Sequence, residues 1–195
     1  KLPLIEKLLP KCNHMLLTGG LANSCLKSLG LNVGESLTSD DTETLTRVKE
    51  ILKEYNKKIV LPFDAIVGKK YDDNYVVSKD INKLANDEII GDIGPKTLKV
   101  YKKIIDESKT IFMNGTAGIY EEAKFSNGTL ELLNIVTSSS AKTIAGGGDC
   151  IGAIDKFNMA DKFTYISTGG GATLEYIINE TLPAIATISD KEEVL

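Results

Sequence analysis

Three glycine clusters in this chain follow apolar runs that are typical of β-strands, and each precedes a helix-like segment. They lie at residues 18–20, 146–149 and 168–171. Glycine lets a ligand approach the backbone, and a helix start offers free N–H groups with a partial positive charge. Each turn alone could be a plain strand-to-helix connection. Three of them at the ends of strands in one sheet would converge, which indicates a phosphorylated ligand.

Asp149 follows three consecutive glycines at an expected helix start. Its carboxylate could hold Mg²⁺ carried by nucleotide phosphates, because Mg²⁺ takes one or two carboxylates and keeps phosphate and water as its other ligands. It could equally be an ordinary helix N-cap. The motifs G-x-x-x-x-G-K-[ST] and G-x-G-x-x-G are absent, which excludes a P-loop protein and argues against an NAD-dependent oxidoreductase.

The composition argues against several other classes of protein. One histidine, His14, and three scattered cysteines do not suit a closed zinc site or a histidine-dependent nucleophile. The net charge of −4 and the lack of a basic stripe argue against a nucleic-acid partner. No apolar run reaches the roughly 18 residues of a membrane span, and the first residues lack the apolar core that is typical of a signal peptide. We therefore expect a cytoplasmic protein with no nucleic-acid or membrane partner, and we also expect a monomer.

Short β-rich runs alternate with amphipathic segments, which predicts βαβ units. We expect an α/β fold: a doubly wound, mainly parallel sheet of about six strands with helices on both faces, a Rossmann-like three-layer sandwich. The whole of 1–195 would form one domain, with its ligand at the carboxyl ends of the strands. Strands are expected at 15–18, 59–61, 65–67, 110–113, 143–145 and 163–166, with an edge strand near 75–77. Helices are expected at 2–9, 21–29, 95–106, 126–136, 150–157 and 172–178, and from an N-cap at Asp40 or Asp41 to about Tyr55.

Six segments resemble, in the same order, motifs of the C-terminal half of phosphoglycerate kinase. They are K-L-P-L-I at 1–5, T-G-G-L-A at 18–22, G-D-I-G-P-K-T at 91–97, N-G-T-A-G-I-Y-E at 114–121, G-G-G-D-C at 146–150 and S-T-G-G-G-A-T-L-E at 167–175. The last two segments are long and specific. The chain departs from the family pattern at Thr18 (usually glycine), Ile90, Gly91, Met113, Thr116 (usually proline) and Cys150 (usually serine or threonine).

The resemblance implies reversible phosphoryl transfer between 1,3-bisphosphoglycerate and Mg-ADP, giving 3-phosphoglycerate and Mg-ATP in glycolysis. In that family the C-terminal domain holds the nucleotide, and the N-terminal domain holds the phosphoglycerate and supplies the catalytic arginine. This chain has one arginine, Arg47, in a helix expected to face solvent. We therefore expect it to bind ADP or ATP without turnover, and to meet 3-phosphoglycerate or 1,3-bisphosphoglycerate only with the absent N-terminal domain. A stand-alone, non-catalytic nucleotide-binding domain is the alternative.

The family's site residues carry over by position. For catalysis these are Lys1, which would also contact nucleotide phosphates, and Gly169, Gly170 and Gly171, whose helix N–H groups would meet the transferred phosphoryl group. Gly19, Gly20 and Gly91 would surround the adenine, Asn114, Gly118 and Ile119 would line the nucleoside, and Glu121 would accept from the ribose hydroxyls. Gly147, Gly148, Asp149 and Cys150 would meet the phosphates, with Asp149 on Mg²⁺.

Overall fold

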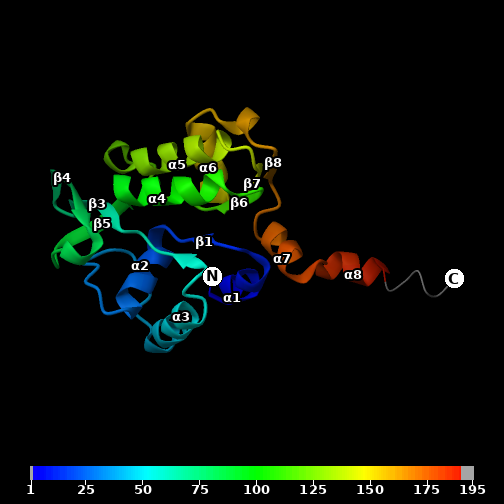
Figure 1. Cartoon of the computed structure of the whole chain (residues 1–195), viewed down its shortest axis with the longest axis horizontal. Coiled ribbons are helices and arrows are strands. Elements are labelled where there is room, and N and C mark those ends of the chain that lie inside the picture. The colour runs from blue at the N-terminus through cyan, green and yellow to red at the C-terminus, as the bar shows by residue number, and fades with distance from the viewer. Residues whose placement is uncertain (1, 190–195) are drawn as a thin grey trace.

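The computed structural model describes residues 2–189, and Figure 1 shows their path. The helices are α1 (Leu2–Leu8), α2 (Gly19–Ser28), α3 (Thr42–Glu54), α4 (Pro95–Asp106), α5 (Asn127–Thr137), α6 (Gly148–Lys156), α7 (Gly171–Asn179) and α8 (Pro183–Ser189). The strands are β1 (Met15–Leu16), β2 (Ile59–Val60), β3 (Asp64–Lys69), β4 (Asp72–Asp80), β5 (Glu88–Ile93), β6 (Thr110–Asn114), β7 (Lys142–Gly146) and β8 (Tyr165–Ser167). Short 3-10 turns lie at Leu9–Lys11, Ile81–Lys83, Ala123–Phe125 and Ala160–Lys162.

Parallel strands flanked by helices confirm the α/β class. β6, β7 and β8 form one parallel sheet, and β1 and β2 form a separate parallel pair. The expected sheet of about six strands is therefore divided at the level of backbone hydrogen bonds. At this division the fully buried Tyr101 of α4 places its hydroxyl 2.6 Å from the carbonyl oxygen of Leu17 and 3.1 Å from that of Val60. A side chain thus satisfies carbonyl groups at the ends of the pair.

The remaining strands form an antiparallel sheet in the order β4-β3-β5. The edge strand expected near 75–77 is the nine-residue β4, whereas β5 was not expected at all. The local sequence pattern does not predict β5, because the strand begins with Glu88 and has Asp92 next to its last residue, and carboxylates are typical of exposed segments. In the structure both side chains are buried. Glu88 is compensated by long-range partners, accepting hydrogen bonds from the Tyr75 hydroxyl at 2.6 Å and from Lys79 Nζ at 2.5 Å.

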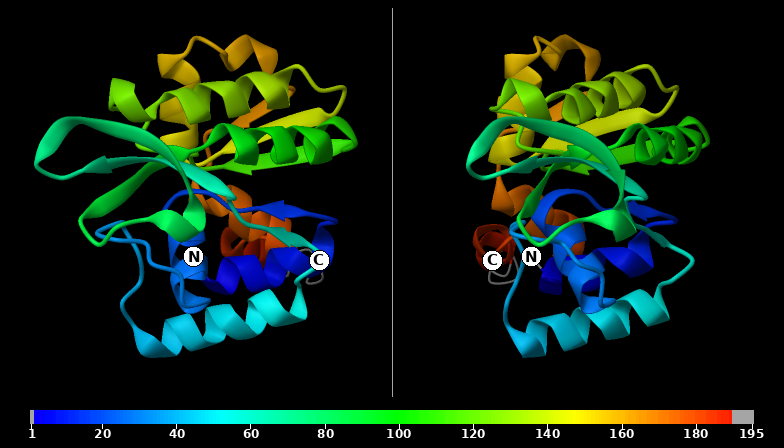
Figure 2. Two further views of the ribbon diagram at one scale, coloured as in Figure 1. Left: turned by 60° about the vertical axis from the view of Figure 1, so that its left-hand side comes forward. Right: turned by 90° about the vertical axis from the view of Figure 1, so that its left-hand side faces the viewer.

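The β1–β2 pair has a hydrophobic core on each side, as the alternation of side chains along a strand requires. Leu16 and Val60 pack on the core built by α4, α5, α6 and the β6–β8 sheet. Met15, Leu17 and Ile59 face the cores built with α1, α2 and α3. Figure 2 shows this arrangement, with α1–α3 below β1 and β2 and with α4 and α5 above them.

Each helix expected from the sequence is present, with its ends within two residues of the prediction. In α3 the side chain of Asp41 accepts from the Thr44 N–H at 2.7 Å, and Val48, Ile51 and Leu52 are buried, so both the cap and the apolar face are confirmed. α8 was not expected, and Figure 1 shows it extending away from the body of the molecule. Across residues 2–189, no helix combines the length and the apolar character that crossing a bilayer requires.

Candidate functional site

A pocket of about 220 Å³ lies where β6, β7 and β8 end. The three strands end level with one another, because Asn114 pairs with Gly146 and Gly146 pairs with Ser167. The turns that follow β7 and β8 therefore converge, as the sequence predicted for 146–149 and 168–171, but the third turn of that prediction, at 18–20, follows β1 in a separate pair of strands. The pocket is lined by Asn114, Gly115, Gly147, Gly148, Asp149, Gly170, Gly171 and Leu174.

The two helix starts at the pocket depend on glycines with left-handed backbone. Gly147 (φ 92°) is the N-cap residue of α6, and Gly170 (φ 53°) is that of α7. A Cβ on Gly147 would lie 2.6 Å from Asn114 Nδ2, which donates a hydrogen bond of 2.8 Å to the carbonyl oxygen of Gly146. The end of β6 is thus tied to the end of β7 by a contact that leaves no room for a side chain at Gly147.

Open space lies in front of both helix starts. A Cβ on Gly148 or on Gly171 would meet nothing within 4 Å. The first N–H groups of a helix have no intrahelical acceptor, and the helix dipole adds a partial positive charge there. Two such helix starts beside one pocket suit an anion with several oxygens, such as a phosphate chain.

Asp149 lies in the first turn of α6 with an exposed carboxylate, and it forms no ion pair with any described residue. The ordinary N-cap interpretation is wrong, because the N-cap residue is Gly147 and no side chain caps this helix. Within residues 2–189 there is no group of three or more histidine, cysteine, aspartate or glutamate side chains that could hold a metal ion. A single exposed carboxylate fits Mg²⁺ that arrives on phosphates, and it does not fit an all-protein cage.

Cys150 directs its side chain into the core. The thiol is fully buried, with Sγ 3.8 Å from the carbonyl oxygen of Met113, and burial raises its pKa to about 11. The thiol is therefore neutral at physiological pH and faces away from solvent. Only the backbone of Cys150 is left to meet a ligand in the pocket.

The first glycine turn lies beside a different loop, the one that follows β6. The Thr18 hydroxyl donates to the carbonyl oxygen of Thr116 at 2.9 Å, and a Cβ on Gly19 would lie 3.6 Å from the same oxygen. A Cβ on Gly20 would lie 3.2 Å from the Leu37 side chain, which is 80% exposed. Gly19 and Gly20 therefore do not line the pocket at α6 and α7.

The loop that follows β6 carries Gly118, Ile119 and Glu121. The Ala117 and Gly118 N–H groups both donate to Thr129 Oγ1 at 3.1 Å, and the Ile119 N–H donates to the carbonyl oxygen of Gly91 at 2.8 Å. Ile119 is 37% exposed, and Glu121 is also exposed. Their side chains are therefore accessible beside the pocket's β6 edge without lining the pocket itself.

Gly91 is buried, and packing alone is enough to explain a glycine there. A Cβ at this position would overlap the ring of Phe125, which is completely buried. Its carbonyl oxygen accepts the hydrogen bond from the Ile119 N–H. The nucleotide role expected for Gly91 stays a prediction.

The structure thus brings together a part of the predicted site. Gly169 is exposed just before the pocket, with its N–H donating to Ser167 Oγ at 3.3 Å, and Lys1 lies outside the described residues. No role was predicted for Gly115 or Leu174, although both stand inside the quoted motifs and both line the pocket. The predicted residues that line the pocket are Asn114, Gly147, Gly148, Asp149, Gly170 and Gly171.

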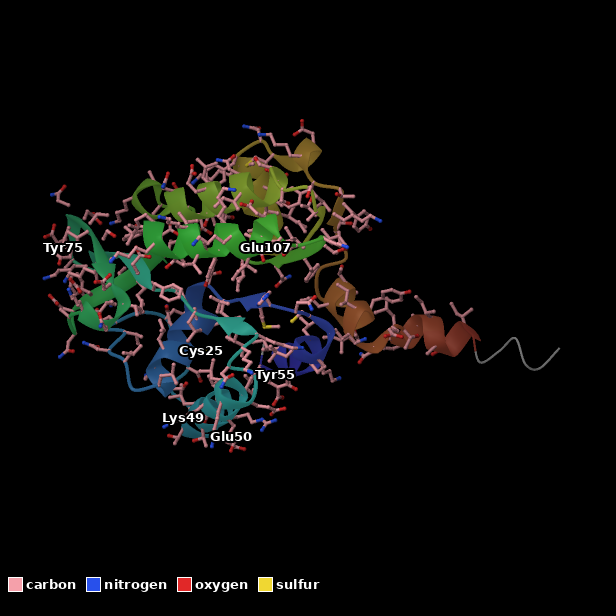
Figure 3. All side chains as sticks on the ribbon, viewed as in Figure 1. Cys25, Lys49, Glu50, Tyr55, Tyr75 and Glu107 are labelled. Atoms are coloured by element: carbon pink, nitrogen blue, oxygen red, sulfur yellow. The ribbon has the colours of Figure 1, made fainter. Side chains whose placement is uncertain are left out.

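Arg47 lies in α3 and is already paired. Its guanidinium contacts Glu6 at 2.5 Å and Glu50 at 2.9 Å, and its side chain is 50% exposed. Figure 3 places Glu50 at the lower edge of the molecule, whereas β7 and β8 lie in the upper half. The arginine does not belong to the pocket.

A second hollow, of about 280 Å³, lies between β4 and the start of α4. Its charges compensate one another: Lys96 and Lys83 pair with Asp80, Lys79 pairs with Glu88, and Asp64 accepts from the first N–H groups of α4. It is larger, but none of the glycine turns opens into it. We therefore place the candidate site at the β6–β8 edge.

Comparison with known proteins gives one consistent result. A family model described as phosphoglycerate kinase matches residues 1–180. The phosphoglycerate kinase of Baumannia cicadellinicola is 42% identical over 193 residues, which cover 99% of this chain and 49% of that protein. The enzyme of Oenococcus oeni is also 42% identical, over 98% of this chain and 48% of its own length. The chain thus spans about half the length of these curated relatives.

Solved structures agree with the sequence comparisons. Phosphoglycerate kinase from Coxiella burnetii superposes with a TM-score of 0.90 at 37% identity, over 98% of this chain and 50% of the other. The kinase from Pyrococcus horikoshii superposes with a TM-score of 0.81 at 28% identity, over the whole of this chain and 50% of the other.

Proposed function

Because this chain belongs to the phosphoglycerate kinase family and corresponds to its C-terminal half, we propose that it binds the Mg²⁺ complex of ADP or ATP at the β6–β8 edge. One observation carries the proposal. Three level strand ends are followed by turns that present two open helix starts beside an exposed carboxylate that forms no ion pair with any of residues 2–189. That is the arrangement that a chelated di- or triphosphate requires.

The roles proposed for the residues follow from where they lie. The N–H groups at the start of α6, around Gly147 and Gly148, bind nucleotide phosphates. Those at the start of α7, around Gly170 and Gly171, bind the phosphoryl group in transfer. Asp149 holds Mg²⁺, which neutralises charge on the phosphates when it is bound. Phosphoryl transfer depends mainly on such positioning and charge compensation, so a site without a histidine or a free thiol suits it.

The nucleoside would lie along the loop that follows β6. Asn114 stands at the junction between this loop and the phosphate pocket. Gly118 and Ile119 would flank the nucleoside, and Glu121 would accept hydrogen bonds from the ribose. Gly19 faces the same loop beside the Thr18–Thr116 contact, and Gly20 faces Leu37; this supports the proposed place of Gly19 around the adenine, with Gly20 next to it.

The proposed overall reaction is reversible transfer between 1,3-bisphosphoglycerate and Mg-ADP, giving 3-phosphoglycerate and Mg-ATP. This chain would supply the nucleotide side of it in the cytoplasm, as a monomer and without nucleic-acid or membrane partners. Its only arginine is held by Glu6 and Glu50, so we propose that the arginine of the transfer step and the phosphoglycerate site come from an N-terminal domain. The 195-residue chain alone would bind nucleotide without turnover.

Isothermal titration calorimetry of the purified chain tests the proposal. We expect saturable binding of Mg-ADP at one site per chain and no binding of NADH. Failure to bind Mg-ADP, or equal binding of NADH, would overturn it. A coupled assay with ATP and 3-phosphoglycerate tests the second part, and a measurable rate from the chain alone would show that no further domain is needed.

A further inference from the structure

The last residue of α6, Lys156, contacts the loop that follows β6. Its Nζ donates to the carbonyl oxygen of Tyr120 at 2.6 Å and to that of Glu121 at 3.2 Å. The same ammonium lies 5.7 Å from the centre of the Tyr120 ring. One side chain thus fixes two consecutive peptide groups of the loop on which Glu121 stands.

A second contact joins the same helix to the same loop. A Cβ on Gly152 would lie 2.6 Å from the Tyr120 hydroxyl oxygen, so the tyrosine lies directly on the helix where a side chain is missing. Gly152 and Lys156 are four residues apart and therefore share one face of α6. On this face the Tyr120 hydroxyl lies against the backbone of Gly152, and the Tyr120 ring lies near the Lys156 ammonium.

α6 consequently touches both parts of the proposed site. Its first turn, with Gly148 and Asp149, lines the phosphate pocket, and its last residue holds the loop that carries Glu121. On its other side this loop is held by the hydrogen bond from the Ile119 N–H to the carbonyl oxygen of Gly91. A cation at the C-terminus of a helix is also electrostatically favourable, which helps to keep the ammonium in place.

We propose that Lys156 is a positioning residue for nucleotide binding. By holding the carbonyl groups of residues 120 and 121 against α6, it fixes the Glu121 carboxylate relative to the phosphate pocket. The distance between the Glu121 carboxylate and the phosphate pocket is then fixed, so that one nucleotide can contact both. This inference rests on the proposed function, since it assigns Lys156 to the nucleoside part of the same site.

The test compares two ligands, Mg-ADP and Mg-pyrophosphate, by calorimetry on four forms of the chain: unchanged, Lys156→Met, Lys156→Arg and Lys162→Met. Methionine keeps an unbranched apolar stem and removes the donor, whereas arginine keeps a cationic donor. Lys162 is an exposed lysine on the Ala160–Lys162 turn after the same helix, so it serves as the matched control.

We expect Lys156→Met to weaken Mg-ADP binding about 3- to 10-fold, as loss of a charged donor to exposed carbonyls implies. Its affinity for Mg-pyrophosphate should stay unchanged, Lys156→Arg should recover most of the Mg-ADP affinity, and Lys162→Met should bind both ligands normally. Far-UV circular dichroism confirms that each variant is folded, and if Lys156→Met is not, Lys156→Leu, which also lacks a donor, replaces it.

Two results would overturn this inference and leave the proposed function standing. In one, the donor-free variant binds Mg-ADP as tightly as the unchanged chain. In the other, it loses Mg-ADP and Mg-pyrophosphate equally, which would give Lys156 a general structural role or a phosphate-binding role. If the unchanged chain fails to bind Mg-ADP, the proposed function falls, and this inference falls with it.

Discussion

The hydroxyl of Thr18 donates a hydrogen bond of 2.9 Å to the carbonyl oxygen of Thr116, which lies 98 positions later in the chain. The bond joins the turn before α2 to the loop after β6, and so connects the β1–β2 pair with the β6–β8 sheet. Thr18 has an extended backbone (φ −138°, ψ 173°) that does not require glycine. Thr18 and Thr116, two of the positions named above as departures from the family pattern, therefore contact each other.

Substitution Thr18→Val tests this contact. Valine keeps the shape and removes the donor, so we expect the free energy of unfolding to fall by about 1 kcal/mol, the usual net value of such a bond. Urea unfolding followed by circular dichroism measures it. Thr18→Ser retains the hydroxyl, so its free energy of unfolding should fall by less. An unchanged unfolding midpoint for the valine variant would contradict the prediction.

Gly147 and Gly148 are adjacent, but their substitution by alanine should have different effects. Gly147→Ala combines a left-handed backbone with a Cβ 2.6 Å from Asn114, and we expect it to cost about 1–3 kcal/mol of stability. Gly148→Ala meets no neighbour within 4 Å and should leave stability almost unchanged. If phosphates bind at the start of α6, the Gly148 variant should nevertheless bind Mg-ADP more weakly.

Thermal melts and calorimetry on both variants separate the two effects. A Gly148→Ala chain that is as stable as the unchanged chain and binds Mg-ADP equally well would place the phosphates elsewhere. A Gly147→Ala chain with normal stability would show that the turn can take another conformation.

Asp149→Ala should weaken Mg-ADP binding more than it weakens binding of metal-free ADP. In the unchanged chain the carboxylate would bind the cation directly, an interaction that metal-free ADP cannot make. Calorimetry with Mg²⁺ and with EDTA gives the affinity of the unchanged chain and of the variant for Mg-ADP and for metal-free ADP. Asp161→Ala, at an exposed aspartate beyond the end of α6, is a control that should change neither. Equal losses with and without the metal would remove the magnesium role.

The buried carboxyl of Asp92 should make stability depend on pH near neutrality. Burial raises its pKa to about 7, although the Gly128 and Ile93 N–H groups donate to it and act in the opposite direction. In the unfolded chain an aspartate loses its proton near pH 4. Between these values the native state binds more protons, so this group's contribution to the free energy of unfolding falls as pH rises from about 4 to 7.

Asp92→Asn removes this dependence, and urea unfolding at pH 5 and pH 7.5 measures it. We expect the stability of the unchanged chain, relative to the variant, to be greater at pH 5 than at pH 7.5. Glu88 does not interfere: burial acts to raise its pKa, but hydrogen bonds from the Ala85 N–H, Lys79 and Tyr75 outweigh that effect and lower the pKa to about 2. A difference that is the same at both pH values would show that Asp92 is ionised throughout.

The sequence by itself determined the fold class and every described helix except α8, and it predicted a site at the ends of strands. These features are encoded locally. The Asp41 cap and the spacing of Val48, Ile51 and Leu52 predict α3 from its own residues. The strand–glycine–helix order predicted three turns at one edge; those at 146–149 and 168–171 meet at the pocket there, whereas the turn at 18–20 follows a strand of another sheet.

Only the tertiary structure decided which residues meet. β5 escaped prediction because Glu88 and Asp92 look like surface residues until partners far along the chain satisfy them in the interior. The direction of the Cys150 thiol, and the contact of Lys156 with the loop after β6, likewise follow from how α6 packs on its neighbours. Hydrophobic periodicity depends on residues that are near one another in the sequence. Burial and pairing depend on atoms that folding brings together from distant parts of the chain. The positions of the site residues depend on burial and pairing, and therefore only the tertiary structure decided them.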